Sequence, residues 1–248
     1  MSISSMWGVA RSLVVYHGQP WKTARMSRFY SQFMVPGDLC FDVGAHVGNR
    51  VRSWVSLGAK VVAVEPQPQM LDVLRGFYGD HPNVVIAPIG LSDEPGSLTL
   101  HINTRNPTLT TFSREWVEGF TANPDLRSAP WDASVEVEVR TLDSLIQEHG
   151  SPAFCKVDVE GFEDKVLDGL TEAIPALSFE AFPLDVERSI RCVERLNGLG
   201  NYRYRTVYAE KFRWVEPEWI DGKAMVERLR NWAPEQGSGD VYARLHSM

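Results

Sequence analysis

From Leu39 onward, short apolar segments alternate with segments whose apolar residues recur at helical spacing. Apolar runs of roughly five residues, bounded by polar or glycine residues, indicate buried strands. In the first half of the chain they predict strands at Leu39–Val43, Lys60–Val64 and Asn83–Ala87. The segments between them predict helices at Asn49–Leu57 and Gln67–Tyr78. The apolar stripe of the second helix is expected to consist of Met70, Leu71, Leu74 and Phe77.

The same alternation returns in the second half of the chain. Predicted strands lie at Ala153–Val159, Ala176–Phe182, Tyr202–Ala209 and Asp240–Leu245. Predicted helices lie at Glu163–Leu170, Val186–Leu196 and Ile220–Trp232. Strands separated by helices of this size form parallel sheets through right-handed crossovers. The pattern therefore predicts an α/β fold with a mostly parallel sheet and helices on both faces.

The middle of the chain departs from this rhythm. Ser97–Ile102 and Val135–Leu142 have the pattern of strands, and strict alternation in the second predicts one solvent-exposed face. The segment between them, Asn103–Ser134, is too long for a structureless connection inside a compact domain. Its aromatic residues are Phe112, Trp116, Phe120 and Trp131. Two interpretations stay open: a lid or binding loop that closes on a ligand, or a surface insert that packs its own aromatic side chains.

The rest of the chain predicts a simple domain organisation. Residues 1–35 are expected to form an N-terminal helical extension of one or two helices. Residues 36–248 are expected to form one domain, with the insert at about 103–134, because no linker-like stretch divides them. The three cysteines, Cys40, Cys155 and Cys192, lack the spacing of zinc or disulfide sites and are expected to be reduced core residues.

Composition narrows the classes of partner. The chain of 248 residues is 44% hydrophobic and 23% charged, which is typical of soluble globular proteins. Its net charge of −7 argues against a nucleic-acid partner, which requires a basic surface. No segment has the roughly 20 apolar residues of a membrane span, and the first residues lack the apolar length expected of a signal peptide. We therefore expect a cytoplasmic protein without a membrane partner; a homo-oligomer is compatible with the sequence but not specified by it.

The segment "LCFDVGAHVGNR" places a glycine-containing turn between a predicted strand and a helix. Gly44 and Gly48 allow the backbone to approach a ligand, and a helix N-terminus attracts anions. The dinucleotide fingerprint is not met, because Asp42 stands at its first glycine position and would repel a pyrophosphate. An acid suits a cationic group instead, such as the ammonium of S-adenosylmethionine. Glu65 ends the next strand at about the distance at which an acid binds ribose hydroxyls.

The successive motifs "DVGAHVG", "VEP", "IGLSD" and "KVDVEGFE" resemble those of the FkbM family of S-adenosylmethionine-dependent methyltransferases. The resemblance covers roughly Gly37 to Leu170 and extends to the order, spacing and strand-end position of the motifs. It implies a single Rossmann-like methyltransferase domain with a seven-stranded sheet, and S-adenosylmethionine as the cofactor.

The resemblance also implies roles for individual residues. The cofactor-binding residues it implies are Asp42, Gly44, Ala45, His46, Gly48, Glu65, Pro66, Ile89, Gly90 and Asp158. Among them, Glu65 would hold the ribose, and Ile89 and Gly90 would lie beside the adenine. His46 stands where family members commonly have asparagine. The segment "TLTT" (Thr108–Thr111) corresponds to a hydroxyl-rich patch of the family.

Lys156 and Asp158 stand two positions apart in the predicted strand Ala153–Val159, which is expected to be buried, and Glu160 continues this spacing. Ligands of open α/β sheets bind beyond the carboxyl ends of the strands, where Asp158, Glu160 and Glu180 are expected. A polar, cationic ligand there would explain charges that are otherwise costly to bury. Lys156 lies deeper and is expected to pair with an acid or to reach the rim of the crevice.

A general base near the methyl group would assist an alcohol nucleophile, and the candidate catalytic residues are Asp158, then Glu160, then Glu180. Two structural alternatives stay open: Asp158 only orients the ammonium of the cofactor, and Glu160 caps the next helix. No residue set predicts a metal site. The leading hypothesis is O-methylation of a small-molecule acceptor, such as a sugar or natural product. The alternatives are an N-methyltransferase, a nicotinamide-dependent oxidoreductase and a non-catalytic binding protein on the same scaffold.

Overall fold

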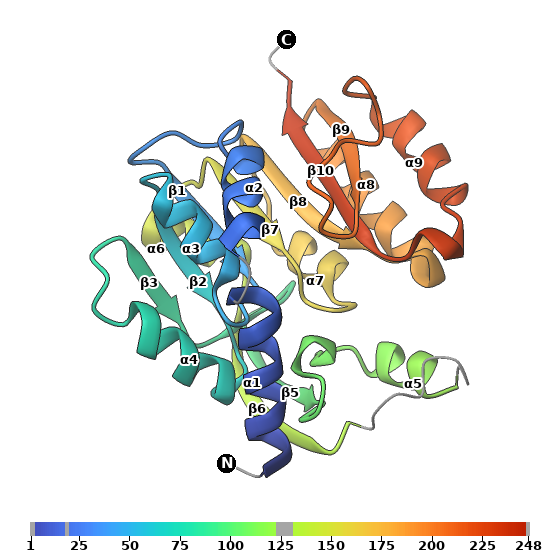
Figure 1. The fold of residues 1–248 in the computed structure, drawn as a ribbon. Helices are drawn as coiled ribbons and strands as arrows, with labels where there is room; N and C mark the ends of the chain where they lie inside the picture. Colours follow the sequence, from blue (N-terminus) through green and yellow to red (C-terminus); the bar gives the residue numbers. More distant parts are fainter. Residues whose placement is uncertain (1–2, 18–19, 123–130, 247–248) are drawn as a thin grey trace.

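The computed structural model describes residues 3–17, 20–122 and 131–246, and a seven-stranded sheet forms its centre (Figure 1). The strand order is β3-β2-β1-β7-β8-β10-β9. The strands are β1 (Leu39–Val43), β2 (Lys60–Val64), β3 (Val84–Ala87), β7 (Phe154–Val157), β8 (Ala176–Ala181), β9 (Tyr202–Tyr208) and β10 (Gly239–Leu245). Strand β10 runs antiparallel to β8 and β9, whereas the other paired strands are parallel. The predicted α/β fold with a mostly parallel sheet is confirmed.

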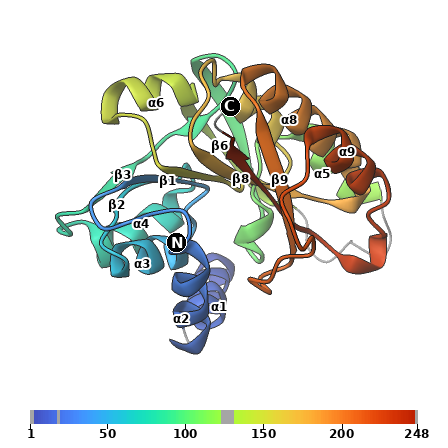
Figure 2. The same ribbon diagram turned by 90° about the horizontal axis from the view of Figure 1, so that it is seen from above.

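Helices cover both faces of this sheet, as Figure 2 shows from above. One face packs against α2 (Pro20–Tyr30), α3 (Asn49–Ser56) and α4 (Pro68–Tyr78). The other face packs against α6 (Leu142–His149), α7 (Glu163–Asp168), α8 (Val186–Leu199) and α9 (Gly222–Arg230). Because side chains alternate along a strand, Cys40 of β1 joins the first core and Phe41 joins the second. Cys40, Cys155 and Cys192 are all buried free thiols, as expected.

Several predicted boundaries differ from the structure; for example, the strand expected over Ala153–Val159 ends at Val157. Phe77 is 55% exposed, and Tyr78 takes the buried position next to Leu74 in α4 because helical spacing continues from Leu74 by four residues. The strand expected to reach Leu142 ends at Arg140, since Thr141 begins helix α6 by accepting the backbone N–H of Ser144 with its hydroxyl.

A second, smaller sheet lies beside the main one, with strand order β4-β6-β5. Its strands are β4 (Gly90–Leu91), β5 (Gly96–Ile102) and β6 (Ala133–Arg140). In β6 the valines Val137 and Val139 are buried, whereas Glu136 and Glu138 are exposed, so the predicted alternation is confirmed. The insert contains a 3-10 turn, η1 (Pro107–Leu109), and helix α5 (Arg114–Ala122). The side chain of Phe120 and residues 123–130 lie outside the described part of the chain.

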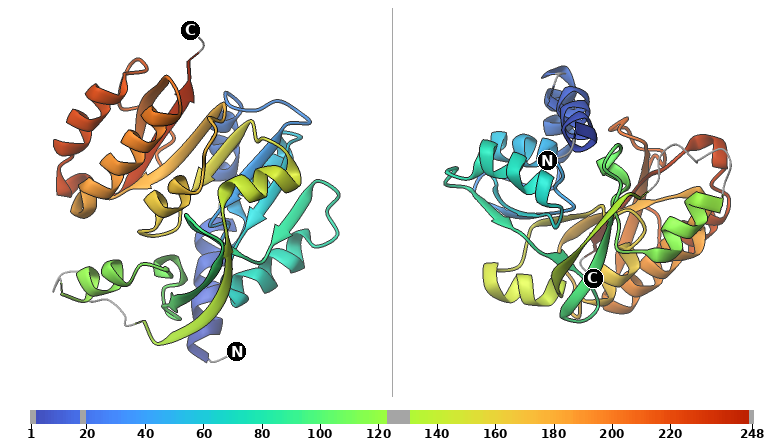
Figure 3. Two further views of the ribbon diagram at one scale, coloured as in Figure 1. Left: turned by 180° about the vertical axis from the view of Figure 1, so that it is seen from behind. Right: turned by 90° about the horizontal axis from the view of Figure 1, so that it is seen from below.

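The N-terminal segment forms two helices, α1 (Ile3–His17) and α2, which lie on one side of the sheet (Figure 3). Helix α2 contributes Met26, Phe29 and Tyr30 to the core on that side. Of the helices in the described ranges, none combines the length and the apolar content needed to cross a membrane. Helix α1 reaches the cavity at the carboxyl end of the sheet through Tyr16, whereas α2 packs against a face of the sheet.

Candidate active site

A cavity of about 480 Å³ opens at the carboxyl ends of β1, β2, β7 and β8. This volume lies within the range of small-molecule and cofactor pockets. Of the residues that the sequence suggested, the cavity is lined by Gly44, His46, Glu65, Pro66, Ile89, Gly90, Asp158, Glu160 and Glu180. The remaining three, Asp42, Ala45 and Gly48, are buried outside the lining. The fold therefore brings residues from four strand ends to one space.

The turn after β1 passes directly against the segment after β7. Gly44 has a φ of 86°, and a Cβ atom added to it would lie 1.9 Å from the carbonyl oxygen of Asp158. No other residue type fits this position without movement of the backbone. Gly48 also has a positive φ, 76°, and it precedes the first turn of α3. Gly44 thus forms part of the cavity wall, whereas Gly48 lies outside the lining and packs closely against Tyr78 and Leu74.

Glu65 lies at the end of β2 and supports the same turn. Its two carboxylate oxygens accept the backbone N–H groups of His46 (2.7 Å) and Gln67 (2.8 Å). Burial raises the pKa of Glu65 to about 7, against the opposing effect of these two hydrogen bonds. Each carboxylate oxygen has a second lone pair, so the side chain is able to accept further hydrogen bonds from a ligand in the cavity.

Asp42 is deeply buried, at 1% exposure, and neither carboxylate oxygen has a hydrogen-bond partner in the described part of the protein. Burial raises its pKa to about 6, although the nearby cations Arg50 and Lys156 act in the opposite direction. Asp42 is paired in register with Lys156 across β1 and β7. The Asp42 carboxyl group is therefore buried beneath the cavity wall and is not part of the lining.

Lys156 forms the buried centre of an ion-pair network. Its ammonium lies 2.6 Å from a carboxylate oxygen of Asp240 and 3.2 Å from one of Asp158. Asp158 also lies 3.3 Å from the guanidinium of Arg50. Burial alone would raise the pKa of the Asp158 carboxyl, but Lys156 and Arg50 outweigh it and hold this pKa below its usual value. The expected pairing of Lys156 with an acid is confirmed.

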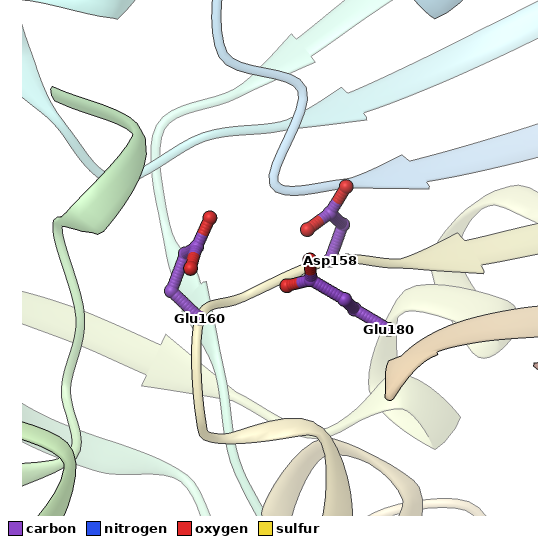
Figure 4. A group of neighbouring side chains, drawn as sticks. All are labelled: Asp158, Glu160 and Glu180. Atoms are coloured by element: carbon purple, nitrogen blue, oxygen red, sulfur yellow. The ribbon is translucent and has the colours of Figure 1, made fainter. Parts of the chain in front are cut away.

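Three carboxyl groups, those of Asp158, Glu160 and Glu180, meet beyond the strand ends (Figure 4). They offer ligand oxygens that lie within 4.8 Å of one another, so they are able to hold a metal ion or another cation. Burial first, and then repulsion from neighbouring carboxylates, raises the pKa of both Glu160 and Glu180 well above the usual value. Glu160 has a φ of 52°, an uncommon conformation that is often found at functional sites.

The structure contradicts the alternative in which Glu160 caps the next helix. Helix α7 follows Phe162 without a side-chain cap. It is Glu163 whose carboxylate accepts the backbone N–H groups of Val159 and Gly161, and Arg188 lies 3.1 Å from the same carboxylate. Glu163 thus fixes the loop that carries Glu160, a role that sequence reasoning missed.

Segments far from the strand ends complete the wall. Tyr16 of α1 lines the cavity, and its ring packs edge-on against His46 with 5.5 Å between the ring centroids. From the insert, the cavity receives Pro107, Thr108, Thr110, Thr111 and Phe112. Trp116 packs instead against Phe182, with 5.1 Å between their ring centroids. The described part of the insert therefore lines the cavity, and its aromatic side chains Phe112 and Trp116 pack against Phe162 and Phe182 outside the insert.

Several lining residues were not predicted, among them Tyr16, Arg50, Glu210 and Asp240. Asp240 is the second residue of the last strand, β10, and a charged residue near a strand end was an available signal. Tyr16, Arg50 and Glu210 carry no such signal, because they come from helices and from the loop after β9. Their positions depend on how those segments pack.

The fold is that of the Rossmann-like methyltransferases: a mostly parallel sheet with one antiparallel strand, and a cavity at the carboxyl ends of its parallel strands. Residues 42–190 match the Methyltransferase FkbM domain. The chain belongs to this family.

A curated relative and two solved structures are similar to this chain. Hexuronic acid methyltransferase AglP of Haloferax volcanii is 29% identical over 150 residues, which are 57% of this chain and 54% of that protein. The chain thus spans about half the length of this relative. Precorrin-6y C5,15-methyltransferase of Geobacter metallireducens matches 89% of this chain and 86% of its own, at 10% identity and a TM-score of 0.46. Aeropyrum pernix fibrillarin with bound S-adenosyl-L-methionine matches 84% and 67%, at 10% identity and a TM-score of 0.43.

Proposed function

We propose that the cavity binds S-adenosylmethionine and that the enzyme methylates a hydroxyl group of a small molecule, such as a sugar or natural product. The observation that carries this proposal is the convergence on one cavity of Gly44, Glu65 and Gly90 with the carboxyl groups of Asp158, Glu160 and Glu180. The first three residues fit a nucleoside, and the three acids fit a cationic group. Membership of the FkbM family favours methyl transfer over the nicotinamide-dependent alternative.

The residues present fit this cofactor. Glu65 retains lone pairs for ribose hydroxyls, and Ile89 and Leu91 offer apolar surface for a base. A Cβ atom on Gly90 would lie 2.6 Å from the ring of Phe112, so glycine leaves room for that ring in the cavity wall. The negative charges of the strand ends favour an ammonium and a sulfonium over a pyrophosphate.

When bound, S-adenosylmethionine supplies an electrophilic methyl group on its sulfonium. The protein has to align the acceptor oxygen with that methyl group and to accept the hydroxyl proton. Asp158 is a poor candidate for the proton acceptor, because Lys156 and Arg50 hold its pKa low. Burial and neighbouring carboxylates raise the pKa of Glu160 and of Glu180 above the usual glutamate value, and a more basic carboxylate is the better proton acceptor. We assign the base to this pair and an orienting role to Asp158.

The charges of the cavity wall also indicate whether the acceptor carries a charge. Besides Glu160 and Glu180, the cavity wall includes the acids Glu210 and Asp240. The guanidinium of Arg50 also lines it. An acceptor carboxylate would meet like charges there, which is unfavourable. We therefore expect a neutral hydroxyl-bearing acceptor, in contrast to the acidic sugar named for the Haloferax volcanii relative.

Cofactor binding is the first test. S-adenosylhomocysteine at about 100 times its dissociation constant should stabilise the folded protein by about 2.7 kcal/mol, because it binds only the folded state. NAD should leave the melting temperature unchanged. A shift with NAD and none with S-adenosylhomocysteine would rule out the methyltransferase assignment of this cavity.

The acceptor is the second test. Methyl-labelled S-adenosylmethionine should label neutral sugars or other polyhydroxyl compounds more readily than matched hexuronates, and NMR of the product should show an O-methyl group. An N-methyl product from an amine panel would favour the alternative N-methyltransferase. Preferred labelling of the hexuronate would contradict the argument from charge.

A further inference from the structure

Helix α1 has two faces with different roles. The inner face presents Gly8, Ser12 and Tyr16, spaced four residues apart, to the protein body. A Cβ atom on Gly8 would lie 2.4 Å from the carbonyl oxygen of Thr104, so the helix packs closely there. The Ser12 hydroxyl lies 3.4 Å from Nε2 of His46, and Tyr16 reaches the cavity. This face fixes the helix against the wall of the active site.

The outer face of α1 is exposed and largely apolar. Its exposed positions are Trp7, Ala10, Arg11, Val14 and Val15, which follow helical spacing. Trp7 is 73% exposed and Val14 is 70% exposed. The first turn of α2 adds Trp21, which is 69% exposed. We call Trp7, Val14, Val15 and Trp21 the outer stripe; both of its helices lie on the same side of the sheet (Figure 3).

The charge of this segment differs in sign from that of the whole protein. Residues 1–37 contain Arg11, Lys22, Arg25 and Arg28 but no aspartate or glutamate. The complete chain has a net charge of −7, so the remainder is strongly acidic. Arg11 lies on the outer face of α1 between Trp7 and Val14, and Arg28 is exposed on α2. Exposed basic residues and exposed tryptophans therefore occur together on helices α1 and α2.

We propose that the outer stripe docks on an anionic lipid surface. Tryptophan partitions to the boundary between acyl chains and headgroups, and nearby basic residues are attracted to anionic headgroups. Helix α1 is too short to span a bilayer, but a helix of this length can lie in its surface. The sequence-based expectation of no membrane partner rested on the absence of a membrane-spanning segment, and a helix that lies in the membrane surface needs none. This inference does not depend on the identity of the cofactor or acceptor.

A second copy of the chain is the competing occupant, and the charges argue against it. A two-fold symmetric contact through the outer stripe would bring the same surfaces together. Such a contact would gather Arg11 and the basic residues of α2 from both copies at one interface, and like charges across an interface are unfavourable. An anionic lipid surface has the complementary sign instead.

The test is flotation of the full chain with vesicles of phosphatidylcholine alone and of phosphatidylcholine mixed with phosphatidylglycerol. We expect binding to the anionic vesicles, weaker binding at high salt, and little binding to phosphatidylcholine alone. Trp7→Glu with Val14→Glu should weaken binding at least about tenfold. The matched control is Leu184→Glu, because Leu184 is 57% exposed outside the stripe. It should bind as the unchanged chain does. Melting curves should show that both variants fold.

Three results would overturn the proposal. The first is absence of vesicle binding, and the second is equal binding to neutral and anionic vesicles. The third is equal loss of binding in the stripe variant and in Leu184→Glu. Light scattering after size exclusion separates the competing occupant: a dimer that the stripe variant converts to a monomer, without vesicle binding, would assign the stripe to a second copy.

Discussion

The Lys156 ammonium lies 2.6 Å from a carboxylate oxygen of Asp240, although the two residues are 84 positions apart in the chain. Strand β8 lies between their strands, so the pair bridges three neighbouring strands of the sheet. Lys156 is fully buried, and its second partner is Asp158. The contact explains how a charged residue is accommodated in a buried strand: its charge is balanced at the boundary between the core and the cavity.

Removing this cation should strongly destabilise the fold. Lys156→Met leaves Asp158 and Asp240 partly buried without their central partner, and the expected loss is about 3–5 kcal/mol of unfolding free energy. The control is Lys165→Met, which breaks an exposed ion pair with Asp93 at 2.9 Å and should cost about 1 kcal/mol or less. Urea unfolding measures both. Equal losses in the two variants would contradict a special role for the buried pair.

Gly44 should tolerate no side chain. Gly44→Ala combines a positive φ with a Cβ atom 1.9 Å from the Asp158 carbonyl oxygen, so the variant should lose at least about 3 kcal/mol or fail to fold. Gly37→Ala is the matched control, because its φ is also positive but no atom lies within 4 Å of the added Cβ. It should lose only about 1 kcal/mol. Similar losses in both would show that backbone strain alone matters.

Glu65 should make the stability of the ligand-free protein depend on pH. Its pKa rises from 4.5 to about 7 on folding, so the folded state holds the proton more tightly than the unfolded state. This contribution is complete below about pH 4.5 and is lost as the pH rises through about 7. Glu65→Gln should therefore flatten the fall in melting temperature over that window. An unchanged slope would show that Glu65 does not titrate there.

Glu65→Gln should also weaken S-adenosylhomocysteine binding, by roughly 1–3 kcal/mol in calorimetry, if the carboxylate binds the ribose. Because the carboxylate holds the backbone N–H groups of His46 and Gln67, loss of the turn is the competing explanation. Melting at low pH separates the two, since glutamate and glutamine are both neutral there. Unchanged affinity would exclude Glu65 as the ribose ligand.

The three clustered acids should respond differently to neutralisation. Glu160→Gln or Glu180→Gln should reduce turnover on the order of 100-fold if that residue is the base, with S-adenosylhomocysteine affinity changed less. Stability should hold or increase, because each substitution relieves repulsion between half-buried carboxylates. Asp158→Asn should instead lose stability, since Lys156 and Arg50 lose a charged partner.

Turnover requires an identified acceptor, so melting and calorimetry come first for these variants. Full turnover in both Glu160→Gln and Glu180→Gln would remove the assigned base. A stable Asp158→Asn variant that lost only cofactor binding would make Asp158 a cofactor ligand, one of the alternatives that the sequence left open.

The sequence by itself determined the order of strands and helices and the acids that follow the strands. Apolar runs and glycine turns are local signals, and carboxyl ends of parallel strands share one edge of a sheet, so Glu65, Asp158, Glu160 and Glu180 could be placed at a common site. The motifs of the FkbM family added the expected roles. Phe77 was misplaced because helical spacing alone does not show which edge of an apolar stripe meets the core.

Only the tertiary structure decided which charges meet. The pairing of Lys156 with Asp240 depends on the position of β10 beside β8, and strand order is set by packing of the whole chain. The same holds for Tyr16, which reaches the cavity only because α1 packs over His46. Asp42, a leading cofactor candidate from sequence, is buried beneath the cavity wall. Asp158 lines the cavity but forms ion pairs with Lys156 and Arg50. Distances between residues remote in sequence depend on long-range packing, and local pattern carries no information about them.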